Sequence, residues 1–292
     1  MDFDADGKND ILSGSYPGEL YLFKGGDDGK FAKSDTLKHA DGKPVKVGMA
    51  AVVYAQDWDA DGDFDLLVGD IEGQVHLVKN DGSKSKPAFG APSLLHAAGN
   101  PIKVSHGDAG PSVADWDRDG NCDLLVGTGA GSVEWFRNTG SNQAPKLAAS
   151  QTLVAAPAQG EANAANANAG GGAKPGTRTK VHATDWNGDG KLDLLVGDFS
   201  YQQAAEPVLT EEQQAAKKTK RDAWMKEYQA LQQAPLDESK EARQARMKKT
   251  AELIAKFKEI NAAEEGAQQA PQSQYHGYVW LYLRQAGVAK AD

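Results

Sequence analysis

The segment DWDADGDFDLLVGDIEGQVHLVKN, residues 57–80, contains the pattern that decides the fold. It begins with an acidic loop at 57–65, in which aspartates alternate with other residues around one glycine. Two apolar runs follow, LLVG at 66–69 and QVHLV at 74–78. Short apolar runs bounded by glycine and turn residues are typical of buried strands, so we expect two strands joined by a tight turn after the loop.

The acidic loop occurs four times in the chain. The copies are DFDADGKND at 2–10, DWDADGDFD at 57–65, DWDRDGNCD at 115–123 and DWNGDGKLD at 185–193. A single copy could be an acidic surface turn, because Asp and Gly both favour turns. Four copies, each followed by the same apolar run, indicate a repeat architecture.

Each loop has the composition of a hard-cation site. Oxygen-bearing side chains stand at positions 1, 3, 5 and 9, and glycine stands at position 6. Calcium prefers six to eight oxygen ligands, whereas magnesium keeps several waters, so the pattern predicts about four calcium ions. The predicted side-chain ligands are Asp2, Asp4, Asp6, Asp10, Asp57, Asp59, Asp61, Asp65, Asp115, Asp117, Asp119, Asp123, Asp185, Asn187, Asp189 and Asp193. The backbone carbonyls at position 7 are predicted to complete the shells; they belong to Lys8, Asp63, Asn121 and Lys191.

Two details refine the metal prediction. Asn187 replaces an aspartate, so we expect the fourth site to bind calcium more weakly than the others. The loops differ from EF-hands, which carry a bidentate Glu at position 12 between two helices. Position 12 here is Ser13, Val68, Val126 or Val196.

The residues around the loops predict a four-stranded antiparallel unit. A further strand is expected after each LLVG-like run, at 18–25, 73–80, 131–138 and 277–285. Strands leading into the loops are expected at 49–56, 110–114 and 179–184, and looser last strands at 87–95 and 144–154. A single sheet of this size cannot close its own core, and radial repetition of such sheets is the β-propeller solution.

The whole repeat resembles the FG-GAP or VCBS repeats of integrin-type calcium propellers. Its pattern is D-x-D-x-D-G-x-x-D-L-L-V-G followed by G-x-V-x-L-x-x-N. The resemblance covers 2–207 and 275–285. It implies a mainly β fold with four recognisable propeller blades and a structural calcium ion between the first two strands of each. Clear Phe-Gly and Gly-Ala-Pro boxes are missing, so the sequence is closer to the bacterial VCBS form. Family propellers commonly have more blades, and we therefore expect a fragment of a longer protein, an open arc, or a strand supplied by a partner.

Two insertions interrupt the repeats. The segment 155–177 is small, polar and Gly-rich, and we expect a flexible low-complexity loop. The segment 208–266 is expected to form a helical hairpin between the second and third strands of the fourth repeat, and 286–292 is a tail. The hairpin is either an arm that contacts a partner or a self-packed pair of helices, and we favour self-packing because each apolar stripe is narrow. The expected stripes are Trp224, Tyr228 and Leu231 in the first helix, and Leu253, Ile254, Phe257 and Ile260 in the second.

An aromatic residue occupies position 2 of every loop: Phe3, Trp58, Trp116 or Trp186. We interpret these residues as packing between blades, with a sugar-binding platform as the alternative.

Several function classes are disfavoured by composition. A net charge of −9 argues against nucleic-acid binding, and no apolar run is long enough for a membrane helix. Cys122 is the only cysteine, so no intrachain disulfide forms. The histidines show no metal spacing, and no catalytic constellation is found.

The predicted function is a calcium-binding module for adhesion, binding or display, with a protein or glycan ligand. The alternatives are the propeller of a secreted, lyase-like polysaccharide-degrading enzyme, catalytic or not, and a purely architectural segment. Weak calcium sites suit the millimolar calcium outside cells, so we expect an extracytoplasmic or secreted protein, although MDFDADGKND lacks the features of a signal peptide.

Overall fold

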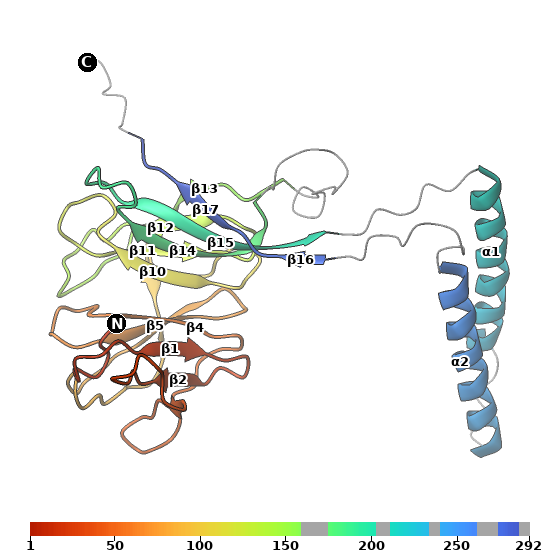
Figure 1. Cartoon of the computed structure of the whole chain (residues 1–292), viewed down its shortest axis with the longest axis horizontal. Helices are drawn as coiled ribbons and strands as arrows, with labels where there is room; N and C mark the ends of the chain where they lie inside the picture. Colours follow the sequence, from red (N-terminus) through yellow and green to blue (C-terminus); the bar gives the residue numbers. More distant parts are fainter. Residues whose placement is uncertain (159–174, 203–210, 234–239, 262–273, 286–292) are drawn as a thin grey trace. The chain divides into compact units, whose positions relative to one another are not determined.

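The computed structural model describes residues 1–158, 175–202, 211–233, 240–261 and 274–285 (Figure 1). They divide into a β-sheet unit, up to Gln202 and from Gln274 onward, and a helical unit between Gln203 and Ser273. The expected tail at 286–292 and most of the expected low-complexity loop, 159–174, lie outside the described residues.

The β-sheet unit contains four antiparallel sheets in chain order, the blades of a propeller. Blade 1 contains β1 (Ile11–Gly14), β2 (Leu20–Phe23) and β3 (Asp35–Thr36). Blade 2 contains β4 (Val52–Gln56), β5 (Asp65–Gly69), β6 (Val75–Val78) and β7 (Ser93–Leu94). Blade 3 contains β10 (Gly110–Ala114), β11 (Asp123–Gly127), β12 (Val133–Phe136) and β13 (Gln151–Val154). Blade 4 contains β14 (Thr177–Thr184), β15 (Asp193–Gln202), β16 (Gln274–His276) and β17 (Val279–Tyr282). A small ribbon of β8 (His96–Ala97) and β9 (Asn100–Pro101) lies between blades 2 and 3 in the sequence. The predicted fold class is confirmed.

Successive blades pack side by side, with β1 next to β4, β4 next to β10 and β10 next to β14 (Figure 1). In blades 1, 2 and 3 the glycine that ends the LLVG-like run permits this approach. A Cβ atom on Gly69 would lie 2.2 Å from the carbonyl oxygen of Ala109, and one on Gly127 would lie 2.2 Å from that of Thr179. These glycines are therefore explained by the backbone of the following blade, not by a turn.

Three apolar cores fill the spaces between the blades. Phe3 is buried against blade 2, Trp58 against blade 3 and Trp116 against blade 4, as the packing interpretation predicted. Trp186 is different, because 61% of its surface is exposed. For Trp186 the packing prediction is wrong within the described residues, since they place no blade beyond blade 4.

Blade 4 is interrupted between β15 and β16, where the chain forms the two helices. β17 pairs with β15 across the insertion, and Leu194 lies opposite Tyr282. β15 continues beyond the predicted strand end, and its last residues pair with β16, so that Gln202 lies opposite Gln274. β16 was not predicted from the sequence.

The helical unit contains α1 (Glu211–Gln233) and α2 (Lys240–Asn261). The two helices pack on each other: Trp224 Nε1 donates to the carbonyl of Leu253 at 2.7 Å, and the ring centroids of Trp224 and Phe257 are 4.6 Å apart. Leu253 is buried, but Ile254 is exposed, so the predicted second stripe is wrong at Ile254. Neither described helix has the length and apolar character needed to span a bilayer.

Candidate metal centres

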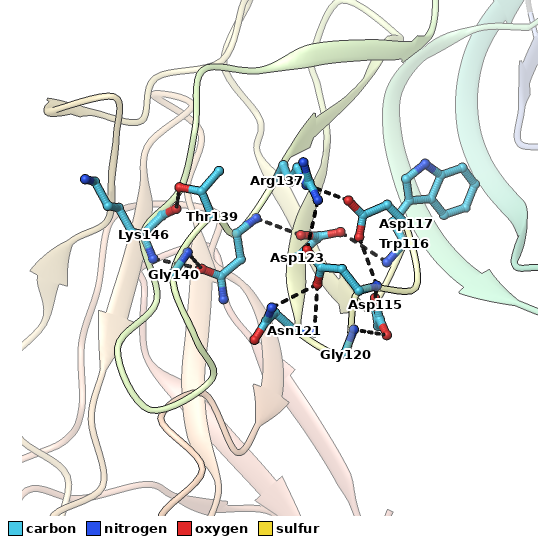
Figure 2. A network of polar contacts seen from close by, with 12 residues as sticks. Asp115, Trp116, Asp117, Gly120, Asn121, Asp123, Arg137, Thr139, Gly140 and Lys146 are labelled. Carbon is cyan, nitrogen blue, oxygen red and sulfur yellow. Dashed lines mark hydrogen bonds and ion pairs between the residues drawn. The ribbon is translucent and has the colours of Figure 1, made fainter.

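The four acidic loops share one backbone conformation. In every loop the position-1 carboxylate accepts the N–H of the position-6 glycine; in the third, Gly120 donates to Asp115 at 3.0 Å (Figure 2). The position-5 carboxylate accepts the N–H of position 7, as in the 2.9 Å bond from Asn121 to Asp119. Position 4 has a positive φ in all four loops, although only the fourth copy has glycine there. The predicted carbonyl ligands Lys8, Asp63, Asn121 and Lys191 occupy position 7 of this shared turn.

The position-9 carboxylate ties each loop to its blade. Asp123 accepts the backbone N–H of Trp116 at 3.1 Å on one oxygen and that of Asn138, beyond β12, at 2.7 Å on the other. Asp10, Asp65 and Asp193 make the same pair of bonds in the other blades. Burial raises the pKa of Asp65 to about 6 and raises that of Asp123 above its ordinary value. Asp123 is therefore a structural link between the loop and the end of the third strand.

Three loops bring carboxylates close enough to share one ion. The groups are Asp2 with Asp4 and Asp6, Asp57 with Asp59 and Asp61, and Asp115 with Asp117 and Asp123; one oxygen from each member lies within 4.8 Å of the others. No comparable group of acidic, histidine or cysteine side chains was found among the described residues of the fourth loop. There the amide oxygen of Asn187 accepts the N–H of Asp189 at 2.9 Å.

A basic residue that sequence reasoning missed contacts each of these three groups. Lys24 Nζ lies 2.5 Å from Asp4, Lys79 Nζ lies 2.7 Å from Asp59, and Arg137 Nε lies 2.5 Å from Asp117 (Figure 2). Each basic residue directly precedes the residue whose backbone N–H donates to the position-9 carboxylate. This place in the sequence could have identified it. In blade 4 the equivalent residue is Leu283, and the next residue, Arg284, packs over the ring of Trp116.

In the first two loops the basic residue leaves one oxygen of the position-3 carboxylate without a partner, whereas in the third loop Asp117 Oδ1 accepts the backbone N–H of Asp119 at 3.3 Å. Lys24 and Lys79 contact Oδ2 of Asp4 and Asp59, whereas the Oδ1 atoms of both aspartates are buried without any hydrogen bond. Asp63 Oδ1, in the second loop, is also buried and unpaired. A buried carboxylate oxygen without a partner is costly. Such oxygens, beside two further carboxylates, suit a hard divalent cation that accepts only oxygen ligands.

Comparison with protein families agrees with the repeats seen in the structure. A family model described as FG-GAP-like repeat matches residues 2–68, 57–126 and 115–196. Each match begins at the first residue of one acidic loop and ends in the strand that follows the next loop. Together the matches span 2–196, which is more than half of the chain. A comparison with curated proteins gave no match. The chain belongs to the FG-GAP-like repeat family.

Proposed function

We propose that the protein is a calcium-stabilised binding module. The observation that carries the calcium assignment is the buried, unpaired Oδ1 of Asp4 and of Asp59, each next to two other carboxylates of the same loop. A calcium ion in the loop would give these oxygens a ligand role and offset the repulsion between the clustered charges.

The first two sites would use positions 1, 3 and 5, with the position-7 carbonyl and water completing the shell. At the third site Asp123 joins Asp115 and Asp117, while Asp119 accepts a bond from Arg137 at 3.0 Å. The fourth site would use Asp185, Asn187 and Asp189, and its neutral amide makes it the weakest. Calcium is favoured over magnesium because these loops supply several oxygens without an octahedral frame.

The ion would be structural in this proposal. The position-9 carboxylate ties the start of the loop to the end of the third strand. A cation bound by the side chains at positions 1, 3 and 5 would therefore also restrain the neighbouring strand ends. In the first three loops the position-2 aromatic residue lies between the first two ligands in sequence and inserts into the core between blades. Calcium binding would therefore stabilise blade packing, and the blades would present their loops to a protein or glycan ligand outside the cytoplasm.

Thermal unfolding with calcium, with magnesium at the same concentration and with a chelator tests the metal assignment. Mass action predicts a gain of about 2.7 kcal/mol for each site whose ligand is at a hundredfold excess over its Kd. Asp59→Asn should lose part of the calcium gain, whereas Asp81→Asn, at a more exposed position beside Lys79, should keep it. Equal stabilisation by both ions, or a full calcium response in Asp59→Asn, would contradict the assignment.

The binding role is tested separately, by screening the calcium-loaded protein against a panel of glycans and extracellular proteins. The proposal expects saturable binding that a chelator abolishes at a temperature where the chelated protein stays folded. Binding that is indifferent to the chelator would contradict a calcium-stabilised binding surface.

A further inference from the structure

Blades 1, 2 and 3 each present one face to the blade that follows, and the residues on that face recur. They are the position-2 aromatic residue, the central leucine of the second strand and the first residue of the third strand. In blade 3 these are Trp116, Leu125 and Val133, all buried in the core shared with blade 4. In blade 2 the equivalents are Trp58, Leu67 and Val75, all buried against blade 3.

Among the described residues, nothing covers the same face of blade 4. Trp186 is 61% exposed, and Val279, the first residue of β17, is 72% exposed. Their equivalents in blade 3, Trp116 and Val133, are at most 7% exposed. Leu281, which lies opposite Leu195 on β15, is also exposed. A Cβ atom on Gly197 would have no neighbour closer than 3.8 Å, whereas the equivalent Gly127 is closed off by Thr179 of the next blade. The face thus has the residues of an interface but no described partner.

In blade 1 the described residues leave the opposite face uncovered, the face that in blades 2 to 4 receives the preceding blade. Ile11 is 45% exposed and Phe31 is 47% exposed. Strand pairing makes Leu66 the equivalent of Ile11 in blade 2, and makes Phe89 the equivalent of Phe31. Leu66 and Phe89 are both buried against blade 1.

We infer that blade 4 of one copy of this chain packs against blade 1 of a second copy, in the way that blade 3 packs against blade 4. The two uncovered faces are the two halves of an interface that the chain already forms three times. The contact is heterologous, so two copies that make it at both ends would close into one ring of eight blades, within the usual range for propellers. The inference depends on apolar packing and is independent of the proposed calcium role.

Trp186 is the expected centre of this contact, because large aromatic residues in closed interface pockets contribute most to binding. Gly197 is the expected point of closest backbone approach. Removing the indole should weaken association without disturbing a core, since Trp186 is exposed in the single chain. Adding a methyl group at Gly197 should obstruct the second copy while leaving the chain's own fold intact.

Sedimentation velocity across a concentration series tests the inference with the full chain. The wild type should approach twice the chain mass of 31.0 kDa as concentration rises. Trp186→Ser, Ile11→Ser and Gly197→Ala should each remain near the single-chain mass, with unchanged circular dichroism. Met247→Ser replaces another exposed apolar side chain, on α2, and should associate like the wild type.

Mixing the variants sharpens the test. Trp186→Ser keeps an intact blade 1 face and Ile11→Ser keeps an intact blade 4 face, so an equimolar mixture should recover one contact and form a heterodimer. Gly197→Ala reports on the same contact should a serine variant fail to fold. A wild type that stays monomeric at the highest attainable concentration, or a dimer that survives both Ile11→Ser and Gly197→Ala, would overturn the inference.

Discussion

Replacing Asp123 by asparagine tests the link between acidic loop and blade without changing side-chain size. The carboxylate is fully buried and accepts one backbone N–H on each oxygen, from Trp116 and from Asn138. An asparagine that keeps its oxygen toward Asn138 turns its amino group toward the N–H of Trp116. One donor is then left facing another donor inside the protein.

The expected cost follows from these contacts. An unsatisfied buried donor costs about 1–3 kcal/mol, and the second hydrogen bond loses the strength that a charged acceptor provides. Part of the cost is recovered, because burial disfavours the charged form of Asp123 and so raises its pKa. We expect a net loss of about 2 kcal/mol, which corresponds to a fall in Tm of roughly 4–8 °C for a domain of this size.

Urea unfolding followed by circular dichroism, with a chelator in both samples, measures this loss apart from any effect on metal binding. Asp81→Asn makes the same chemical change at an exposed side chain and should stay within about 0.5 kcal/mol of the wild type. If Asp123→Asn unfolds at the same urea concentration as Asp81→Asn, the carboxylate does not hold the loop to the blade.

Three further predictions concern the loops, the blade interface and the insertion. Lys79→Met should raise calcium affinity in calorimetric titrations, because the lysine ammonium, 2.7 Å from Asp59, no longer repels the ion. Weaker calcium binding would show instead that Lys79 supports the site. Gly127→Ala should lower the free energy of unfolding by about 1–3 kcal/mol in denaturant titrations, because the new Cβ atom would meet the carbonyl of Thr179. Gly197→Ala should leave it nearly unchanged at concentrations where the chain is monomeric. Similar losses in both glycine variants would contradict the assigned packing. Replacing 203–273 by Asn-Gly should preserve the Tm of the β-sheet unit, because Gln202 and Gln274 are paired and a two-residue turn can join them. Loss of cooperative unfolding would mean that the helices support the blades.

The elements that the sequence predicted well are those encoded by neighbouring residues. The loop at 115–123 and strand β11 follow from alternating aspartates, one glycine and a short apolar run, all within a dozen or so residues. β3 and β7 are only two residues long, and the broad segments expected for the last strand of a blade could not locate such short pairings.

The features that the sequence did not reveal depend on distant contacts. Trp186 occupies the same loop position as Trp116, and the two differ because the described residues place a following blade against Trp116 but none against Trp186. A lysine at the end of a strand, such as Lys79, is ordinary in sequence, and the fold alone brings it to Asp59. β16 was missed because its pairing with β15 joins residues on either side of the long insertion.

Equilibrium dialysis against radioactive calcium, at saturating free calcium, counts the ions bound per chain and so tests directly whether the acidic loops are calcium sites. The four acidic loops predict about four ions per wild-type chain, with the last filling at higher concentration because Asn187 weakens its loop. The double variant Asp57→Asn, Asp59→Asn should bind one ion fewer while the other sites fill normally. No calcium uptake at millimolar free ion, or an unchanged count in the double variant, would contradict the assignment of these loops as calcium sites.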